Sequence, residues 1–119
     1  MTKQEAINKH RQMWRWIAEK TEERRKAVNK IDYFNETGQM LGKPKNLCWC
    51  CEYAQSIDKD FRRMCDNCPI QWKTDWSLRI TPCCDRWSEY TVWDESVLAS
   101  NWRKAACWAK IIAELPERG

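Results

Sequence analysis

The chain is organised around two cysteine pairs, Cys48-Trp49-Cys50-Cys51 and Cys65-Asp66-Asn67-Cys68-Pro69, which thirteen residues separate. Taking Cys48 with Cys51 and Cys65 with Cys68 gives two C-x2-C motifs. This is the ligand spacing of a tetrahedral four-cysteine zinc site. Such a site is closed, because four thiolates leave no coordination position open for a substrate. The stretch therefore predicts one zinc ion that holds the fold.

The two half-sites differ in their turn chemistry. Asn67 tolerates the left-handed backbone that a metal-binding turn often needs, and Pro69 prevents a helix from continuing. The first half-site has neither Gly nor Pro. For this reason Cys50 is an alternative ligand to Cys51.

The other cysteines have no fixed place in this scheme. Cys83 and Cys84 are reserve ligands, either for the same site or, with Cys50, for a second zinc ion. Cys107 falls inside an expected helix, where a buried apolar thiol is the commoner role. Disulfides and reduced core thiols are the competing explanations for eight cysteines. Against disulfides, the first residues carry no apolar signal segment and no stretch approaches a membrane span, so we expect a reducing cytoplasm.

Length and charge favour one folded domain. The 119 residues are 43% hydrophobic and 32% charged, with a formal net charge of +4. Residues 1–47 hold eleven Lys or Arg against six Asp or Glu, so they carry +5 and the remainder carries −1. A basic segment meets nucleic acid, an acidic protein or solvent. Solvent is favoured, because Glu5, Glu19, Glu22 and Glu23 interrupt the basic residues.

Apolar spacing predicts helices at both ends of the chain. Thr2 and Glu5 form a capping box for a helix over about 3–27. Asn29 with Asp32 caps a second helix over 30–37, unless this segment continues the first helix. The first helix has a stripe of residues that recur every three or four positions, as on one face of a helix. The stripe contains Ala6, His10, Met13, Ile17, Thr21, Arg24 and Val28. In the second, Ile31 and Phe34 are expected to face inward and Gly38 to close the end.

The last part of the chain predicts one further long helix. Leu98, Trp102, Ala105, Ala109 and Ile112 follow helical spacing over about 95–115, before Pro116 ends it. A short helix is expected over about 52–64, and short strands or irregular segments over 70–93.

The expected architecture is a mainly α single domain over 1–119. It contains an N-terminal helical segment (1–38), a zinc-bound Cys- and Trp-rich lobe (46–93) with an irregular or short-β middle, and a C-terminal helix (95–115). The N- and C-terminal helices are expected to pack together, because each has an apolar stripe to bury.

The nine tryptophans are the second unusual feature of the composition. Most are expected to build the core, but Trp is also enriched where protein interfaces bind most tightly. The candidates for exposure and partner binding are Trp14, Trp16, Trp72 and Trp76, joined by Arg11, Arg15, Arg24 and Arg25.

The inventory for catalysis is poor. There is one histidine, His10, and a lone helix histidine is more often a surface or packing residue than a catalytic one. Nothing in the sequence brings it to a free cysteine, as a Cys/His nucleophile would require. The zinc-deaminase pattern of H-x-E and P-C-x-x-C is absent. We therefore expect neither an enzyme nor a small-molecule substrate.

Several phrases resemble small cysteine-rich proteins encoded by bacteriophages of Gram-positive bacteria. They are Trp14-Arg15-Trp16-Ile17-Ala18-Glu19, residues 48–53, residues 65–72 and the closing residues 112–118. The resemblance implies a phage accessory protein that works in the host cytoplasm and alters host machinery or a defence system. The function expected from it is a zinc-stabilised module that binds a host protein.

The alternative function is nucleic-acid binding by a zinc-containing protein. In that case phosphates would be bound by Lys9, Arg11, Arg15, Lys20, Arg24, Arg25 and Lys26, and unpaired bases would stack on Trp. A salt titration distinguishes protein binding from nucleic-acid binding, because nucleic-acid affinity falls steeply with ionic strength.

Overall fold

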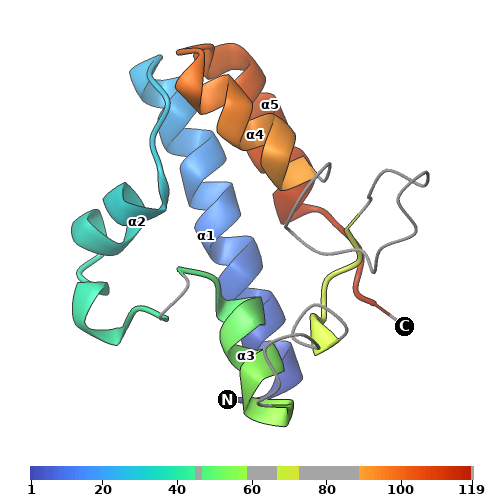
Figure 1. Cartoon of the computed structure of the whole chain (residues 1–119). Coiled ribbons are helices and arrows are strands. Elements are labelled where there is room, and N and C mark those ends of the chain that lie inside the picture. Colours follow the sequence, from blue (N-terminus) through green and yellow to red (C-terminus); the bar gives the residue numbers. More distant parts are fainter. Residues whose placement is uncertain (45–46, 59–66, 73–88, 119) are drawn as a thin grey trace.

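The computed structural model describes residues 1–44, 47–58, 67–72 and 89–118. These residues form α1 (Lys3–Arg24), α2 (Lys30–Glu36), the 3-10 turn η1 (Met40–Gly42), α3 (Trp49–Ile57), α4 (Glu89–Leu98) and α5 (Trp102–Ala113). Figure 1 shows α1 as the central helix, with α3 beside its N-terminal half and α5 beside its C-terminal half. The expectation of a mainly helical protein whose first and last helices pack together is confirmed. No helix in the described ranges is long and apolar enough to cross a membrane.

The bounds of α1 follow from its caps. The Thr2 side chain accepts a hydrogen bond from the Glu5 N–H at 3.1 Å, which is one of the two bonds of the predicted capping box. The helix ends at Arg24 rather than near Ala27, because Arg25 takes a left-handed conformation with φ of 52°. The predicted apolar stripe is buried apart from Arg24, which is exposed.

Helix α2 begins at its predicted cap, but its buried face is not the predicted one. Asn29 and Asp32 exchange side-chain to backbone hydrogen bonds of 2.9 Å, and Gly38 ends the turn with a φ of 71°. Phe34 is fully buried, as predicted, but Ile31 is 41% exposed, so its inward orientation is wrong. The buried face is set by Tyr33 and Phe34, and Ile31 lies about 200° around the helix from Tyr33.

The C-terminal region holds two helices where one was expected. Residues 89–93 belong to α4 rather than to strands or irregular chain, and the helix predicted over 95–115 breaks at residues 99–101. At the break Ser100 is left-handed, with φ of 56°, and the Asn101 side chain accepts a hydrogen bond from the Lys104 N–H at 3.2 Å. An Asn that caps a new helix N-terminus in this way competes with continuation of the old one.

The break changes which side chains are buried. Leu98, on the predicted stripe, is 78% exposed at the end of α4. Cys107 is exposed, so the expectation of a buried thiol is wrong. It lies opposite the face of α5 that packs on α1 and α4, which is formed by Ala105, Ala106, Ala109, Ile112 and Ala113.

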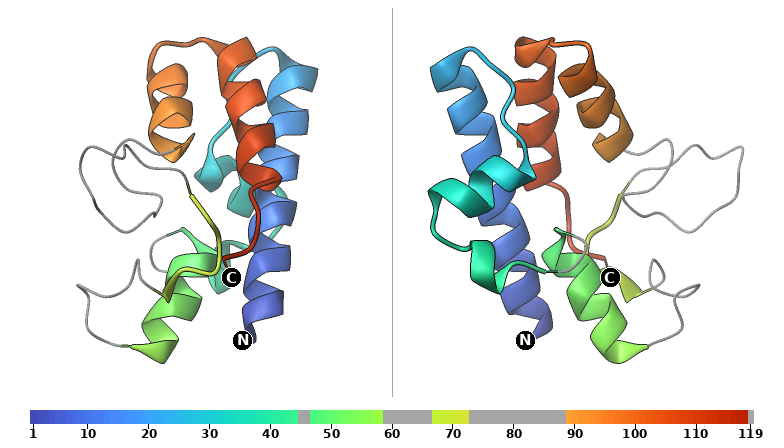
Figure 2. Two further views of the ribbon diagram at one scale, coloured as in Figure 1. Left: turned by 90° about the vertical axis from the view of Figure 1, so that its right-hand side faces the viewer. Right: turned by 60° about the vertical axis from the view of Figure 1, so that its left-hand side comes forward.

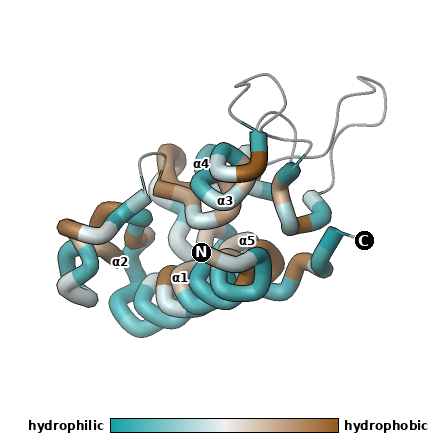
Figure 3. The backbone as a smooth tube through the Cα atoms, turned by 90° about the horizontal axis from the view of Figure 1, so that it is seen from below, coloured by the Kyte–Doolittle hydropathy of each residue, from teal (hydrophilic) through white to brown (hydrophobic). Residues whose placement is uncertain are grey.

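These alanines explain the close contact of α1 and α5. A face built from small side chains lets two helix backbones approach, and the larger Ile7, Met13 and Ile17 of α1 fill the remaining space, each with no exposed surface. Two further views in Figure 2 show α5 running along α1. Figure 3, seen from below, shows that the outer side of this helix pair is hydrophilic.

The ion pair between Arg24 and Glu36 fastens the end of α1 to α2. Arg24 Nη1 donates to Glu36 Oε2 at 2.8 Å, and Nη2 contacts Oε1. The hydrogen bond from Arg24, aided by the charges of Arg24 and Lys20, lowers the pKa of Glu36. A lowered carboxyl pKa stabilises the folded state fully above the unfolded value of about 4.3, and this stabilisation is lost as pH falls through the folded value.

We therefore expect a pH-dependent difference between the protein and its Glu36→Gln variant. The parent should melt slightly higher at pH 7, and the gap should close as pH falls below about 4, because the unfolded-state carboxyl then binds its proton first. The measurement is the melting temperature of both proteins from pH 2 to pH 7. A gap that stays constant across this range would show that the ion pair contributes nothing. The effect is small, since both side chains are about two-fifths exposed.

Candidate metal centre

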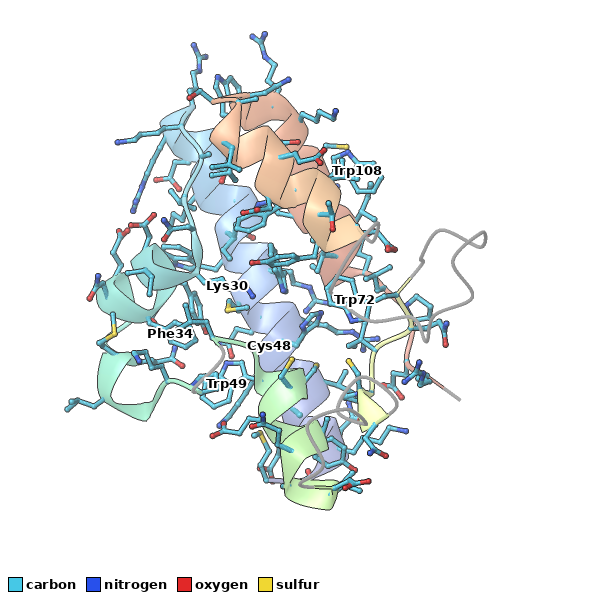
Figure 4. All side chains as sticks on the ribbon, viewed as in Figure 1. Lys30, Phe34, Cys48, Trp49, Trp72 and Trp108 are labelled. Carbon is cyan, nitrogen blue, oxygen red and sulfur yellow. The ribbon has the colours of Figure 1, made fainter. Side chains whose placement is uncertain are left out.

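The first cysteines lie where α3 begins, earlier than the sequence predicts. Cys48 is the extended residue before the helix, with φ of −141°, and Cys50 and Cys51 lie in its first turn. Cys48 is 6% exposed and Cys50 is fully buried, whereas Cys51 is half-buried. Figure 4 shows Cys48 at the start of α3, beside α1. Cys48 and Cys50 are thus buried where α3 packs on α1.

The segment that carries Cys68 is placed by the C-terminal end of the described chain. The Gln71 N–H donates to the Pro116 carbonyl at 2.9 Å, and the Arg118 N–H donates to the Pro69 carbonyl at 2.8 Å. These bonds form an isolated antiparallel bridge between Ile70 and Glu117. Because of it, Cys68 is 5% exposed and lies against the core.

The tail that forms this bridge is itself anchored to α1. Arg11 donates to the Leu115 carbonyl at 3.2 Å and pairs with Glu117 at 3.7 Å. Lys3 donates to the Arg118 carbonyl at 3.4 Å. We call residues 115–118 the C-terminal strap. It connects the Cys68 segment to the central helix.

Three thiols converge, with Cys50 in the middle. Its hydrogen bonds with Cys48 and Cys68, together with burial, raise the pKa of the Cys50 thiol. The hydrogen bond from Cys50 in turn lowers the pKa of Cys68, and those from Cys50 and Cys51 lower that of Cys48 well below the ordinary value. The thiolate is the form of cysteine that binds metal.

His10 lies beside this cluster, and sequence reasoning missed the contact. The imidazole is 1% exposed and neither ring nitrogen has a hydrogen-bond partner. Its ring packs edge-on against Trp72, at 5.8 Å between centroids. After Cys50 and Cys51, His10 also helps to lower the pKa of Cys48, as does the charge of Lys30. His10 and Cys48 therefore influence each other, and both are buried.

The structure describes only some of the predicted zinc ligands. Cys48 and Cys68 each interact with Cys50, and Cys51 interacts with Cys48. Cys65, Cys83 and Cys84 lie outside the described residues. Among the residues that are described, no three His, Cys, Asp or Glu side chains already stand as a group able to hold a metal ion. Zinc therefore stays a prediction.

The predicted partner-binding tryptophans are mostly core residues. Trp14 and Trp72 are each 1% exposed, so their expected exposure is wrong. Trp14 packs against Trp93 of α4, a helix that the sequence did not predict, with ring centroids 4.8 Å apart. Trp16 is partly buried against Tyr33. Trp76 lies outside the described residues.

The predicted arginines divide into two groups. Arg11 is held by the C-terminal strap and Arg24 by Glu36. Arg15 and Arg25 are exposed. Arg15 lines a shallow cavity of about 310 Å³ between α1 and α5, which also contains Glu19, Glu22, Lys110 and Glu114. The charges of this cavity are mixed.

A more uniform surface lies where α1 ends and α4 turns into α5. A cavity of about 410 Å³ there is lined by Arg25, Lys26, Ala27, Val97, Ser100 and Trp102. The Arg103 guanidinium lies 5.1 Å from the centre of the Trp102 ring. We call Arg25, Lys26, Trp102 and Arg103 the basic tip. It combines three cations with one partly exposed indole.

Comparison with known proteins gives no matching family, no matching curated protein and no matching solved structure. The resemblance to phage-encoded proteins therefore rests on the sequence phrases alone. The cysteine cluster and the basic tip have to be interpreted from their own chemistry.

Proposed function

We propose that this protein is a non-enzymatic, zinc-stabilised module that binds an acidic segment of another protein through the basic tip. The observation that carries the proposal is the cavity between Arg25, Lys26 and Trp102. An indole beside cations suits a partner that presents carboxylates next to an apolar side chain. The carboxylates would pair with the cations, and the apolar side chain would pack on the indole.

A binding role is favoured over catalysis by the burial of the chemically capable groups. Cys48 and His10 are 6% and 1% exposed, so a substrate has no access to them. A nucleophile must reach the bond that it attacks, at hydrogen-bond distance from its base. This pair instead suits a structural role within the cluster.

A protein partner is favoured over nucleic acid by how the basic side chains of α1 are used. Four of the seven expected phosphate ligands contact other groups of the protein. Arg11 and Arg24 bind the strap and Glu36, Lys20 pairs with Glu23, and Lys9 lies 4.4 Å from the centre of the Trp49 ring. A continuous cationic stripe along the helix is therefore lost, while the basic tip keeps its charges available.

The zinc ion is proposed to hold the lobe that contains α3 and the Cys68 segment. The expected ligands are Cys48, Cys51, Cys65 and Cys68, with Cys50, Cys83 and Cys84 in reserve. The resemblance to phage proteins supplies the biological setting. In this setting the partner is a host protein, and proteins of host defence systems are among the candidates.

The test is charge reversal at the basic tip. Immobilised protein should retain specific proteins from a bacterial lysate, and the Arg25→Glu, Lys26→Glu double variant should retain them at least about tenfold less, which corresponds to ~1.4 kcal/mol. The affinity is then measured by calorimetry with the purified partner. The matched control is Arg15→Glu with Lys43→Glu, which makes the same charge change at exposed residues elsewhere.

Equal retention by all three proteins would contradict a role for the tip. A second titration addresses the alternative function. Binding of a single-stranded oligonucleotide that falls steeply with salt and is lost in the tip variant would replace the protein partner with nucleic acid.

A further inference from the structure

The buried imidazole of His10 is the most unusual polar group in the described structure. A neutral imidazole carries one donor and one acceptor nitrogen, and here both lack partners while the residue is 1% exposed. Leaving a buried polar group unsatisfied costs about 1–3 kcal/mol. Its aromatic neighbours Trp14 and Trp72 offer no acceptor, so packing alone does not explain a histidine at this position.

The position of His10 relative to the thiols supplies the missing explanation. Helix α1 packs against α3 and places the imidazole near the Cys48 thiol, while the C-terminal strap holds the segment that carries Cys68. Three buried thiols and one buried imidazole thus lie on three separate segments that share one core. Tetrahedral zinc sites are commonly built from three cysteines and one histidine.

We infer that His10 is a zinc ligand that completes a Cys3His site with Cys48, Cys50 and Cys68. This inference rests on the proposed function, since it assigns the ligands of the same zinc ion. The inferred site differs from the four-cysteine site predicted from the sequence at two ligands. Cys50 replaces Cys51, and His10 replaces Cys65.

The choice of Cys50 follows from its place in the cluster. It has no exposed surface, whereas Cys51 is half-buried. The described side chains are not yet arranged as a metal-holding group, so binding requires rotation of side chains toward a common point.

The inference gives the metal a role beyond its own lobe. A four-cysteine site would close only the stretch from 48 to 68, whereas a His10 ligand joins this stretch directly to the central helix. Metal binding would then fix the packing of α1 on α3.

X-ray absorption on the zinc-loaded full chain tests the ligand set. The expected first shell holds three sulfurs at about 2.3 Å and one nitrogen at about 2.0 Å from zinc. His10→Cys should keep zinc and convert this shell to four sulfurs. His10→Phe should lower zinc affinity by more than about 100-fold, beyond the loss typical of an outer-shell residue.

Met13→Leu is the matched control, because Met13 lies on the same buried face and this change conserves volume. It should leave zinc affinity and the shell unchanged. A four-sulfur shell in the parent protein, with His10→Phe retaining zinc, would overturn the His10 assignment and leave the zinc proposal standing. A parent protein that binds no zinc would overturn both. The parent spectrum decides the question even where His10→Phe does not fold.

Discussion

A Cys68→Ser variant is expected to purify without zinc and to lose most of its fixed tertiary packing. Cys68 belongs to both ligand sets considered above, the one based on spacing and the one that includes His10. It is 5% exposed and hydrogen-bonds with Cys50, so no solvent ligand can easily replace its sulfur. Structural zinc contributes about 10–16 kcal/mol of binding free energy, which is folding free energy in such sites.

The comparison should use elemental analysis for zinc and near-ultraviolet circular dichroism for packing. The expected variant has less than about one tenth of the parent zinc content, a loss expected for a structural ligand. Cys107→Ser is the matched control, because it makes the same atomic change at an exposed cysteine of α5. Full zinc content and an unchanged melting temperature in Cys68→Ser would remove this residue from the site.

The second large effect is expected from Trp14→Ala. Trp14 joins α1 to α4 through an edge-on contact with Trp93 at 4.8 Å between ring centroids and another with Tyr90 at 6.1 Å. The Lys30 ammonium also lies 5.6 Å from its ring centre. Truncation of a buried aromatic residue to alanine removes these contacts and leaves a cavity, at a cost of about 3–5 kcal/mol.

That cost is a large share of the roughly 5–15 kcal/mol by which a domain is stable. Urea unfolding at saturating zinc measures it, since saturation removes differences in metal occupancy. Trp16→Ala is the control, because Trp16 is on the same helix but only partly buried, and it should cost roughly half as much or less. A loss below about 1 kcal/mol in Trp14→Ala would show that the aromatic contact with α4 does not form as described.

The sequence predicts best the features that neighbouring residues determine. The helix starts at Thr2 and Asn29 are confirmed, because a capping side chain bonds to a backbone group only three residues away. The buried stripe of α1 is also recovered, since an amphipathic helix buries its apolar face whichever helices cover it. One of these helices, α5, supplies a matching small-residue face.

The errors come from contacts between distant residues. Trp14 is at the edge of the predicted stripe, and it is buried only because α4 exists and turns back from the Asn101 break. His10 and Cys48 are far apart in the sequence, and no spacing rule relates one helix histidine to a cysteine on another helix. Their meeting depends on the packing of α1 against α3, which tertiary structure alone determines.

The C-terminal strap also sets a time order for biosynthesis. Residues 115–118 hold the Cys68 segment in place, and they are made after every other described part of the chain. A ribosome that adds about 5–20 residues per second therefore exposes Cys48, Cys50 and Cys68 for several seconds before the strap emerges. During that interval the thiols are open to oxidation or to capture of the wrong ion.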